Sequence, residues 1–339
     1  MRAVVLVGGF GTRLRPLTYS TPKPMLPIGG RPMIARLIDR LARGGVTEVV
    51  LALGFKPEPF IEAFPDGRCG DVTLTYAVEP EPLDTAGAIR FAADQAGIDD
   101  TFIVANGDVL TDLDVSHLVA THRRLAADAT IHLIAVDDPS SFGVVDITVD
   151  GHGVGPVRAF VEKPAPGTEP SNLISAGTYV LEPSMLSLMP AGVKSSIERD
   201  VFPKIVAGGG LYGVATDDYW IDAGRPELYL AANLDLLSGV RRFDDCAPID
   251  ATAEVDASAL VRNSIVGAAA RIARDARIID SVILPGAVVG AGSCIERSLV
   301  MGVVGAGATV IGSMIGAEGR VDDGVRLVDG AVPAAPSLT

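Results

Sequence analysis

The sequence predicts an α/β fold followed by a β-helix, and three observations lead to this prediction. Short apolar segments alternate with amphipathic helices up to about residue 135. A glycine-rich loop with basic residues follows the first of these segments. After Asp235 the pattern changes, and from Val266 onward apolar residues recur at steps of six.

The first part of the chain is typical of a mostly parallel, Rossmann-like sheet with helices on both faces. Its expected strands are Ala3 to Val7, Val49 to Leu53, Val72 to Ala77, Phe102 to Ala105 and Ile131 to Val136. Its expected helices lie near 32–44, 85–96 and 114–127. A run of strands over 142–182 and helices near 195–207 and 225–238 complete this part. Ligands of such sheets bind at the carboxyl ends of the strands, so we expect the site there.

The last part of the chain has the period of a β-helix, in which each coil must stack on its neighbours to bury a core. The apolar residues of this period are Val266, Ile272, Ile278, Val289, Ile295, Val304, Val310, Val321 and Leu327. The pattern resembles the hexapeptide-repeat left-handed β-helix, with a β-sandwich as the alternative. We therefore expect a catalytic domain over 1–238, a linker over 239–248, a β-helix over 249–332 and a disordered tail over 333–339.

Composition favours a large enzyme of the cytoplasm. A chain of 339 residues with 48% hydrophobic content exceeds one ordinary core, which favours two domains. The three cysteines, Cys69, Cys246 and Cys294, are widely scattered, which suits reduced thiols. The first strand follows Met1 and Arg2 directly, without an apolar segment long enough for a signal peptide or a membrane span. We expect a cytoplasmic protein without a membrane partner.

The charge of the chain is strongly uneven. A net charge of −14 argues against a nucleic-acid partner, which would need a basic face. Through Arg43, however, eight basic residues stand against Asp39 alone, a net charge of +7 that would attract small anions. Three of these basic residues, Arg36, Arg40 and Arg43, are expected to form the exposed face of a helix.

Residues 8–32 combine glycines with Arg13 and Lys23, both placed among glycines and prolines where a helix is disfavoured. Glycines at 8, 9 and 11 allow a tight turn with bare N–H groups that can hold phosphates. The loop is not a P-loop, because Thr12 follows Gly11 where that motif has lysine. It is not a dinucleotide fingerprint either, because the third glycine and the later acidic residue are missing.

The motif Gly-Gly-x-Gly-Thr-Arg-Leu-x-Pro-Leu-Thr, followed by Pro-Lys-Pro, resembles the signature of the sugar-1-phosphate nucleotidyltransferases, and within them the mannose-1-phosphate guanylyltransferase-like branch. The resemblance implies that Arg13 contacts the departing pyrophosphate and that Lys23 contacts the α-phosphate. It also implies nucleotide contacts from a set of loop and strand residues, namely Leu6, Gly8, Gly9, Gly11 and Thr12.

Two acidic motifs match the metal ligands of this family. Asn106-Gly107-Asp108 directly follows an apolar strand, and the resemblance makes Asp108 the principal Mg²⁺ ligand. Trp220-Ile221-Asp222-Ala223-Gly224 resembles the second motif, with Asp222 as the second ligand. Read without the family, Asp108 is a turn residue and Asp222 caps the helix that begins near Arg225.

The sugar-phosphate motif of the family is matched by Phe160-Val161-Glu162-Lys163-Pro164, in which Glu162 would accept sugar hydroxyls and Lys163 would meet the phosphate. Gly143 and Gly177 match glycines that let the sugar approach the backbone. Ser175 stands where the family usually has asparagine, so one sugar contact differs. An ordinary exposed strand end is the alternative interpretation of the Glu-Lys pair.

The base-binding turn of the family is matched by Glu79 to Ala88, with expected nucleotide contacts from Glu79, Asp84, Thr85 and Gly87. Asp84 replaces the usual glycine. A carboxylate can accept the two adjacent donors of guanine, which favours GTP. Failing Asp84, Glu79 is the candidate, and Asp84 as a helix cap is the alternative.

These matches predict Mg²⁺-dependent transfer of a nucleotidyl group from an NTP, preferably GTP, to a sugar 1-phosphate, preferably mannose 1-phosphate. Thymidylyl, uridylyl or adenylyl transfer to glucose 1-phosphate, another sugar or cyclitol phosphate, and a non-catalytic regulatory subunit remain alternatives. A hexapeptide-repeat acyltransferase is disfavoured, because it needs a histidine within the coils and all four histidines precede residue 153. We expect a homo-oligomer assembled through the β-helix.

Overall fold

The computed structural model describes residues 1–9, 11–54, 57–241 and 246–333. The chain divides into two compact units, Met1–Gly9 with Ala35–Trp220 and Phe10–Ile34 with Ile221–Thr339. Within the described residues, no helix is both long and apolar enough to cross a membrane. Part of the expected linker, 242–245, and most of the expected tail, 334–339, lie outside the described residues. The domain boundaries at 238 and 248 stay predictions.

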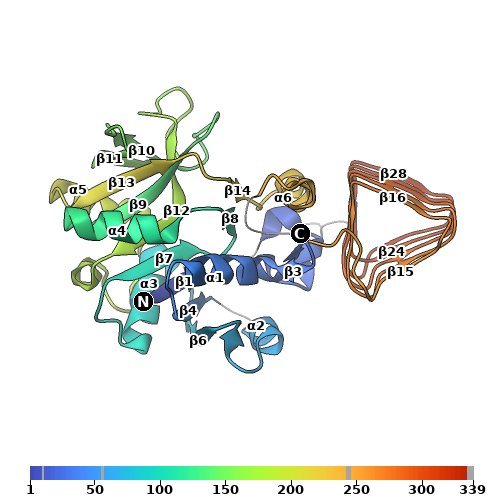
Figure 1. Ribbon diagram of the computed structural model, residues 1–339, viewed down its shortest axis with the longest axis horizontal. Coiled ribbons are helices and arrows are strands. Elements are labelled where there is room, and N and C mark those ends of the chain that lie inside the picture. The colour runs from blue at the N-terminus through green and yellow to red at the C-terminus, as the bar shows by residue number, and fades with distance from the viewer. Residues whose placement is uncertain (10, 55–56, 242–245, 334–339) are drawn as a thin grey trace, which may run out of the picture. The chain divides into compact units, whose positions relative to one another are not determined.

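The first unit is built on a mixed sheet whose strands come from distant parts of the sequence (Figure 1). In spatial order the strands are β10 (Gly143–Ile147), β11 (Val154–Glu162), β13 (Leu211–Thr216), β9 (Ala129–Ala135), β12 (Leu173–Leu181), β7 (Phe102–Asn106), β1 (Arg2–Leu6), β4 (Glu48–Leu53), β6 (Val72–Val78) and β5 (Arg68–Cys69). A further short strand, β8 (Val109–Thr111), follows β7 in the chain.

The direction of the strands changes across this sheet. Strand β1 pairs in parallel with β4 and β7, and β4 pairs in parallel with β6, as the alternating strands and helices predict. Strand β12 pairs antiparallel with both β7 and β9, and β10 pairs antiparallel with β11. The sheet is therefore parallel from β7 to β6 and largely antiparallel beyond β7, while the short edge strand β5 pairs antiparallel with β6. The reason is local, because strands β10 to β12 follow one another without crossover helices.

Helices cover both faces of the sheet. They are α1 (Met33–Arg43), α2 (Glu58–Ala63), α3 (Asp84–Ala96), α4 (Val115–Leu125) and α5 (Phe202–Ala207), the last preceded by a π-helical turn, Ile197–Val201. Helix α3, the π-helical turn and α5 share one apolar core with the sheet. Helix α4 contacts β9 and β12 outside that core.

The expected exposed basic face of the first helix is wrong for two of its three residues. Arg36 is 3% exposed and Arg40 is 9% exposed. The Arg40 guanidinium donates to the carboxylate of Asp112 at 3.3 Å, between Nη2 and Oδ1, and Asp112 is buried too. Sequence spacing places these arginines on one side of α1, but only tertiary packing decides that this side meets an acidic partner.

The second unit contains the loop of residues 11–34, helix α6 (Pro226–Ser238) and the stacked coils. The loop holds a small hairpin of β2 (Pro27–Ile28) and β3 (Arg31–Pro32). Asn233 of α6 is fully buried and its Oδ1 accepts from the Gly29 amide at 2.9 Å. The Tyr229 hydroxyl donates to the Pro27 carbonyl. These bonds attach the hairpin to α6.

The coils form a parallel β-helix with three flat faces, each a sheet of five short strands. One face contains β15 (Glu254–Val255), β18 (Arg271–Ile272), β21 (Val288–Val289), β24 (Val303–Val304) and β27 (Arg320–Val321). The second contains β16 (Leu260–Arg262), β19 (Arg277–Ile279), β22 (Cys294–Glu296), β25 (Thr309–Ile311) and β28 (Arg326–Val328). The third contains β17 (Ile265–Val266), β20 (Val282–Ile283), β23 (Leu299–Val300), β26 (Met314–Ile315) and β29 (Ala331–Val332).

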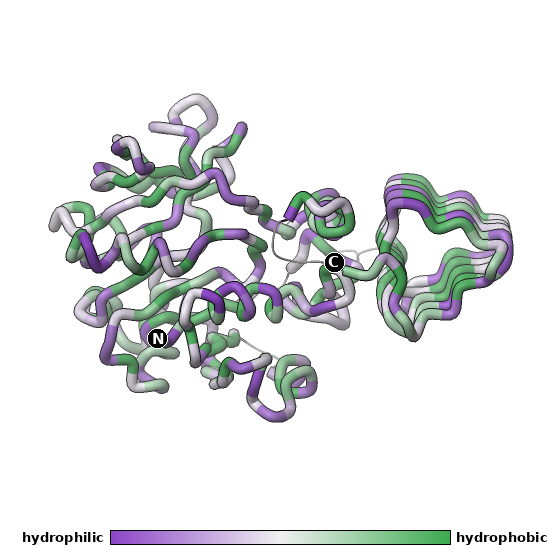
Figure 2. Tube along the Cα trace, in the orientation of Figure 1, coloured by the Kyte–Doolittle hydropathy of each residue, from purple (hydrophilic) through white to green (hydrophobic). Residues whose placement is uncertain are grey.

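The residues of the six-residue period point into the β-helix, as expected. Val266, Ile272 and Ile278 are buried in its core together with their counterparts in later coils. Hydrophobic residues recur at the same places in successive coils (Figure 2). Stacked neighbours lie 17 residues apart in most coils and 15 apart at Ser298 and Ser313. Three steps of six residues would need about 18 residues per coil, so coils of 17 and 15 residues explain the slips in the period that the sequence shows.

A ladder of buried serines occupies one corner of the β-helix. The Oγ of Ser264, Ser281 and Ser298 each accepts the backbone N–H of the next serine, at 3.0 to 3.1 Å, and the Oγ of Ser313 accepts the Gly330 amide at 3.0 Å. Each hydroxyl also donates to the carbonyl two residues earlier, as Ser281 does to Ile279. Every coil therefore satisfies the backbone of the next coil at a position that water does not reach.

We expect Ser281→Ala to destabilise the β-helix by about 1–3 kcal/mol, because it leaves the buried Ser298 amide without its acceptor. Urea denaturation followed by circular dichroism measures this change. The control is Ser258→Ala, which removes a similar bond to the Asp275 amide at an exposed corner. Water can replace that bond, so we expect a loss of about 0.5 kcal/mol or less. Equal losses in the two variants would contradict the ladder.

Candidate functional site

Three charged side chains converge on one glycine in the second unit. The Lys23 Nζ donates to the Asp222 Oδ1 at 2.9 Å. A Cβ added to Gly224 would lie 2.8 Å from that carboxylate oxygen, 2.9 Å from the Lys23 Nζ and 3.1 Å from the Arg13 Nη2. Arg13, Lys23 and Asp222 therefore surround a point that only glycine leaves open. We call these three residues the charged cluster.

The loop is shaped so that Lys23 enters this cluster. Gly11 has φ +56°, and a Cβ there would meet Thr18 at 3.0 Å and Lys23 at 3.1 Å. The Thr18 hydroxyl donates to the Gly11 carbonyl at 2.8 Å. Lys23 is only 5% exposed and begins a short 3₁₀ turn, Lys23–Met25. Burying a lysine amine needs a partner, and Asp222 provides it.

Asp222 does not cap the following helix. Helix α6 begins at Pro226, its N-cap residue is Arg225, and no side-chain cap is formed there. Asp222 ends the short strand β14 (Trp220–Asp222), and its carboxylate pairs with Lys23. The alternative role that the sequence leaves open for this residue is therefore not adopted.

Asp108 in the first unit lies at a strand end, as expected. Strand β7 ends at Asn106, and the Gly107 amide donates to the Leu6 carbonyl at the end of β1, at 2.8 Å. Gly8 and Gly9 follow β1, and Gly9 has φ +142°, a value that favours glycine. Asp108 thus occupies the carboxyl edge of the parallel half of the sheet.

The donor chemistry of Asp108 and Asp222 fits Mg²⁺, which binds oxygen and often takes one or two protein carboxylates plus substrate phosphates. No group of three or more His, Cys, Asp or Glu residues within the described parts of the chain could hold a metal by itself. A closed structural metal site is thus not found there. A metal held jointly with a phosphate is the form that these carboxylates suit.

The second group of predicted residues gathers around Glu162. Gly143 on β10 lies opposite Glu162 on β11 in the strand register. A Cβ at Gly143 would stand 2.4 Å from the Phe160 ring and 3.0 Å from the Glu162 Oε2. Burial, and then the charge of Glu198, raise the pKa of Glu162, while Lys163 opposes the shift. Gly143 is therefore the residue that gives the Glu162 carboxylate its room.

Gly177 on β12 performs a similar role for Asn106. Its φ is +76°, and a Cβ there would lie 2.7 Å from the Asn106 Nδ2. Close by, the Trp220 indole donates to the Ala176 carbonyl at 2.9 Å, and its ring meets Phe142 edge-on at 5.7 Å. Ser175 lies on the same strand, two residues before Gly177. This part of the sheet thus offers an apolar wall beside polar groups.

Lys163 extends from the end of this strand pair. Its backbone has φ +49°, and its side chain is 67% exposed, with Nζ 3.4 Å from the Glu162 Oε1. An exposed amine held near a carboxylate at this spacing can turn to an incoming anion at low cost.

The turn expected to bind the base, Glu79 to Ala88, is organised by two carboxylates. Glu79 is 7% exposed, its Oε2 accepts from the Leu83 amide at 2.8 Å, and burial raises its pKa. Asp84 has φ +60°, which explains why glycine is usual at this position in the family it resembles. The Asp84 Oδ1 accepts from the Thr85 amide at 2.9 Å and its Oδ2 from the Arg199 Nη2 at 3.0 Å.

Gly87 serves the packing of α3. A Cβ there would lie 2.7 Å from the Val193 carbonyl oxygen, and the Gly87 amide donates to the Ser195 carbonyl at 3.2 Å. The Ser195 amide in turn donates to the Leu83 carbonyl at 3.0 Å. The segment before the π-helical turn is therefore joined to the start of α3. The nucleotide contact expected of Gly87 stays a prediction.

Several residues that the sequence did not predict as site residues lie beside the predicted ones. They are Phe142, Glu198, Arg199 and the indole of Trp220. Ser196 to Arg199 reads as an ordinary capped helix start with an acidic first turn, so its letters give no sign of a ligand site. The sequence could have indicated Phe142 as a site residue, because it directly precedes Gly143, which is predicted to lie in the site.

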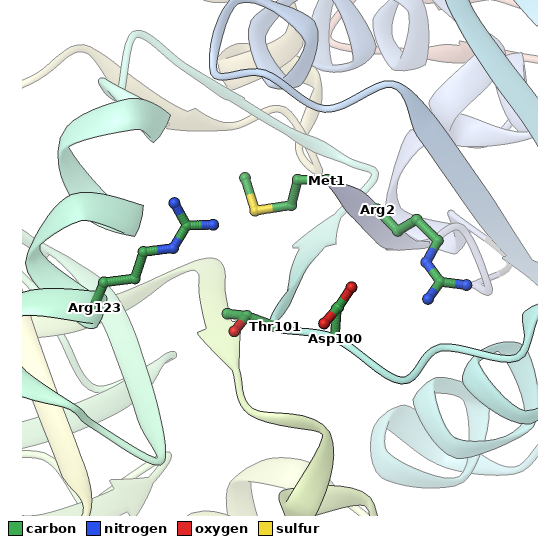
Figure 3. Close-up of a pocket in the computed structure, with 5 residues that line it drawn as sticks. All are labelled: Met1, Arg2, Asp100, Thr101 and Arg123. Carbon is green, nitrogen blue, oxygen red and sulfur yellow. The ribbon is translucent and has the colours of Figure 1, made fainter.

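A separate pocket of about 390 Å³ lies elsewhere in the first unit, lined by Met1, Arg2, Asp100, Thr101 and Arg123 (Figure 3). Arg2 begins β1 and Thr101 directly precedes β7, so this pocket lies at the amino ends of the strands. None of the predicted site residues lines it. Because ligands of such sheets bind at the carboxyl ends, we do not assign it to the site.

Comparison with known proteins shows which proteins the chain is similar to. A mannose-1-phosphate guanylyltransferase of Mycobacterium tuberculosis is 39% identical over 307 residues, covering 87% of this chain and 83% of that protein. A probable mannose-1-phosphate guanylyltransferase of Oryza sativa is 38% identical, covering 96% of this chain and 89% of that protein. The solved structure of HddC from Yersinia pseudotuberculosis is 34% identical with a TM-score of 0.57, covering 68% of this chain and 97% of that one.

The family model described as nucleotidyl transferase matches residues 2–239, which include the charged cluster, the base-binding turn and the surroundings of Glu162. The relatives extend the likeness through the β-helix. The chain therefore belongs to the nucleotidyl transferase family and is a sugar-phosphate nucleotidyltransferase.

Proposed function

We propose that this enzyme transfers the guanylyl group of GTP to mannose 1-phosphate, giving GDP-mannose and pyrophosphate. The observation that carries the proposal is the charged cluster, in which the Lys23 Nζ, the Arg13 Nη2 and the Asp222 carboxylate surround Gly224. Joining two anions needs fixed positive charge and alignment more than covalent chemistry. Buried Lys23 and exposed Arg13 supply such charge.

The choice of mannose and guanine rests on the relatives. Two relatives that cover most of the chain carry the name mannose-1-phosphate guanylyltransferase. HddC, whose structure is similar, was also solved in complex with GMP-PN, at 33% identity and a TM-score of 0.57. The alternatives, another NTP or another sugar or cyclitol phosphate, are distinguished by pyrophosphate release over a panel of NTPs and sugar 1-phosphates. A panel in which dTTP or UTP is the best donor would overturn the guanylyl assignment alone.

In the proposed reaction, Arg13 stabilises the departing pyrophosphate and Lys23 the α-phosphate. Glu162 accepts sugar hydroxyls and Lys163 binds the sugar phosphate. Leu6, Gly8, Gly9, Gly11 and Thr12 hold the nucleotide. The acceptor is the phosphate oxygen of the sugar 1-phosphate, and its attack on the α-phosphorus breaks the bond to pyrophosphate. These charges also speak against a non-catalytic regulatory subunit, which would have no need to bury Lys23.

Mg²⁺ is the proposed metal, with Asp108 and Asp222 as the residues that would hold it. When bound, it neutralises phosphate charge. Lys23 keeps the Asp222 carboxylate in place, because the two are joined at 2.9 Å.

Glu79 is the stronger candidate for reading guanine. Both oxygens of Asp84 already accept hydrogen bonds from protein donors, Thr85 and Arg199. Of Glu79, only Oε2 has a donor among the described residues, the Leu83 amide. Its second oxygen can accept from the base.

We further propose a homo-oligomer through the β-helix and a cytoplasmic location.

The charged cluster predicts the effect of removing its cations. Arg13→Ala and Lys23→Ala should each lower kcat by about a hundredfold or more, the scale of losing a fixed charge that acts in the transition state. Steady-state kinetics of pyrophosphate release measures this. Arg43→Ala, at the far end of α1, is the control for loss of one positive charge. A change confined to KM would remove the two residues from the chemical step.

The metal proposal predicts that activity vanishes in excess chelator and returns with Mg²⁺. Asp108→Asn should unfold at the temperature of the wild type yet lose nearly all turnover, since the amide is a poor Mg²⁺ ligand. Thermal melting and pyrophosphate release are measured on the same samples. Full activity in chelator, or in this variant, would remove the metal from the mechanism.

The base proposal predicts that Glu79→Gln lowers kcat/KM for GTP relative to ITP by about tenfold, or about 1.4 kcal/mol. ITP lacks the 2-amino group. The glutamine carbonyl would keep the bond to the Leu83 amide, which turns its NH₂ group toward the donors of guanine. Asp84→Asn is the matched control and should leave the ratio unchanged. A changed ratio in the control alone would transfer the role to Asp84.

A further inference from the structure

Glu198 occupies an unusual position on the π-helical turn Ile197–Val201, which directly precedes α5. Such turns are rare and occur frequently at functional sites. The Glu198 Oε2 accepts two hydroxyl hydrogen bonds, from Thr85 Oγ1 and from Ser196 Oγ, each at 2.7 Å. The carboxylate is therefore held firmly by one of its two oxygens.

The hydroxyls that hold Glu198 are themselves fixed by the backbone. Thr85 Oγ1 accepts from the Ile197 amide at 2.8 Å, and Ser196 Oγ accepts from the Arg199 amide at 3.2 Å. Each hydroxyl thus has its own proton directed at Glu198. This arrangement orients an anionic acceptor and leaves the other oxygen, Oε1, without a donor among the described residues.

The turn that carries Glu198 contacts β11, the strand that ends at Glu162. The negative charge of Glu198 raises the pKa of Glu162. It also raises the pKa of Tyr179, which burial raises most. Tyr179 is 2% exposed, and its hydroxyl has no hydrogen-bond partner in the described part of the chain. A buried hydroxyl without a partner costs free energy until a ligand or water satisfies it.

We propose that Glu198 is a second sugar-binding carboxylate, whose Oε1 accepts a hydrogen bond from a hydroxyl of the hexose phosphate beside Glu162. The inference rests on the proposed function, because it assumes a sugar 1-phosphate as acceptor. Sugar hydroxyls donate to carboxylates, so one ring placed between Glu198 and Glu162 satisfies both and separates their charges. Lys163 and Arg199 balance the local charge.

The test separates sugar binding from a role in shaping the base-binding turn. Glu198→Gln is compared with the wild type while each substrate is varied at saturating concentrations of the other. We expect KM for the sugar 1-phosphate to rise about tenfold and KM for the NTP to change less than twofold. Glu62→Gln, an exposed carboxylate on α2, is the matched control. A rise in KM for the NTP alone, or no change in either, would overturn the proposal.

A set of deoxy sugars makes the assignment specific. The 2-, 3-, 4- and 6-deoxy analogues of the sugar 1-phosphate lack one hydroxyl each. For one of them, the wild type should lose about tenfold in kcat/KM, and Glu198→Gln should lose almost nothing further, because the bond is already gone. If every analogue is penalised equally in both enzymes, Glu198 does not contact the sugar.

Two controls keep the outcomes distinct. Glu198→Asp retains the charge but withdraws Oε1, so it should also raise KM for the sugar 1-phosphate and serves if the glutamine variant fails to fold. An active wild type with unchanged Glu198 variants defeats this inference and leaves the proposed function intact. A wild type that releases no pyrophosphate with any hexose 1-phosphate defeats both.

Discussion

The ion pair between Lys23 and Asp222 joins two segments that are 199 residues apart, and the charged cluster depends on it. A lysine that is 5% exposed would be costly without a carboxylate beside it. The pair fixes the position of the amine relative to Arg13. It also keeps the Asp222 carboxylate in place, with Oδ1 toward the lysine. One contact thus orders a candidate phosphate-binding cation and a candidate metal ligand together.

Glycines are the second constraint, because they let charged groups approach the backbone. Gly224 leaves room for the three members of the charged cluster, Gly143 for the Glu162 carboxylate and Gly177 for the Asn106 amide. In each case an added Cβ would lie at 3.1 Å or less from these polar groups. Such glycines fix the position of their neighbours by the absence of a side chain, so replacing one changes a site residue elsewhere in the sequence.

The two units solve the problem of burying polar groups in different ways. In the β-helix, the serines of the ladder repeat a single solution, and each coil satisfies the next. In the sheet domain, the polar groups are individual: Arg40 meets Asp112, and Thr85 meets Glu198. A repeated solution can be read from its period. An individual solution requires two partners that are distant in sequence, and the sequence around one partner does not identify the other.

The sequence alone determined the order of strands and helices, the core of the β-helix and the family, because hydrophobic period and glycine-rich motifs are local properties. It placed Asp108 at a strand end for the same reason, whereas the strand register of the structure placed Gly143 opposite Glu162. Tertiary structure decided the antiparallel half of the sheet, the burial of Arg36 and Arg40, and the pairing of Asp84 with Arg199. Only the tertiary structure identified Glu198 as a candidate ligand-binding residue. Whether a carboxylate can bind a ligand depends on which donors and charges the fold brings to each of its oxygens.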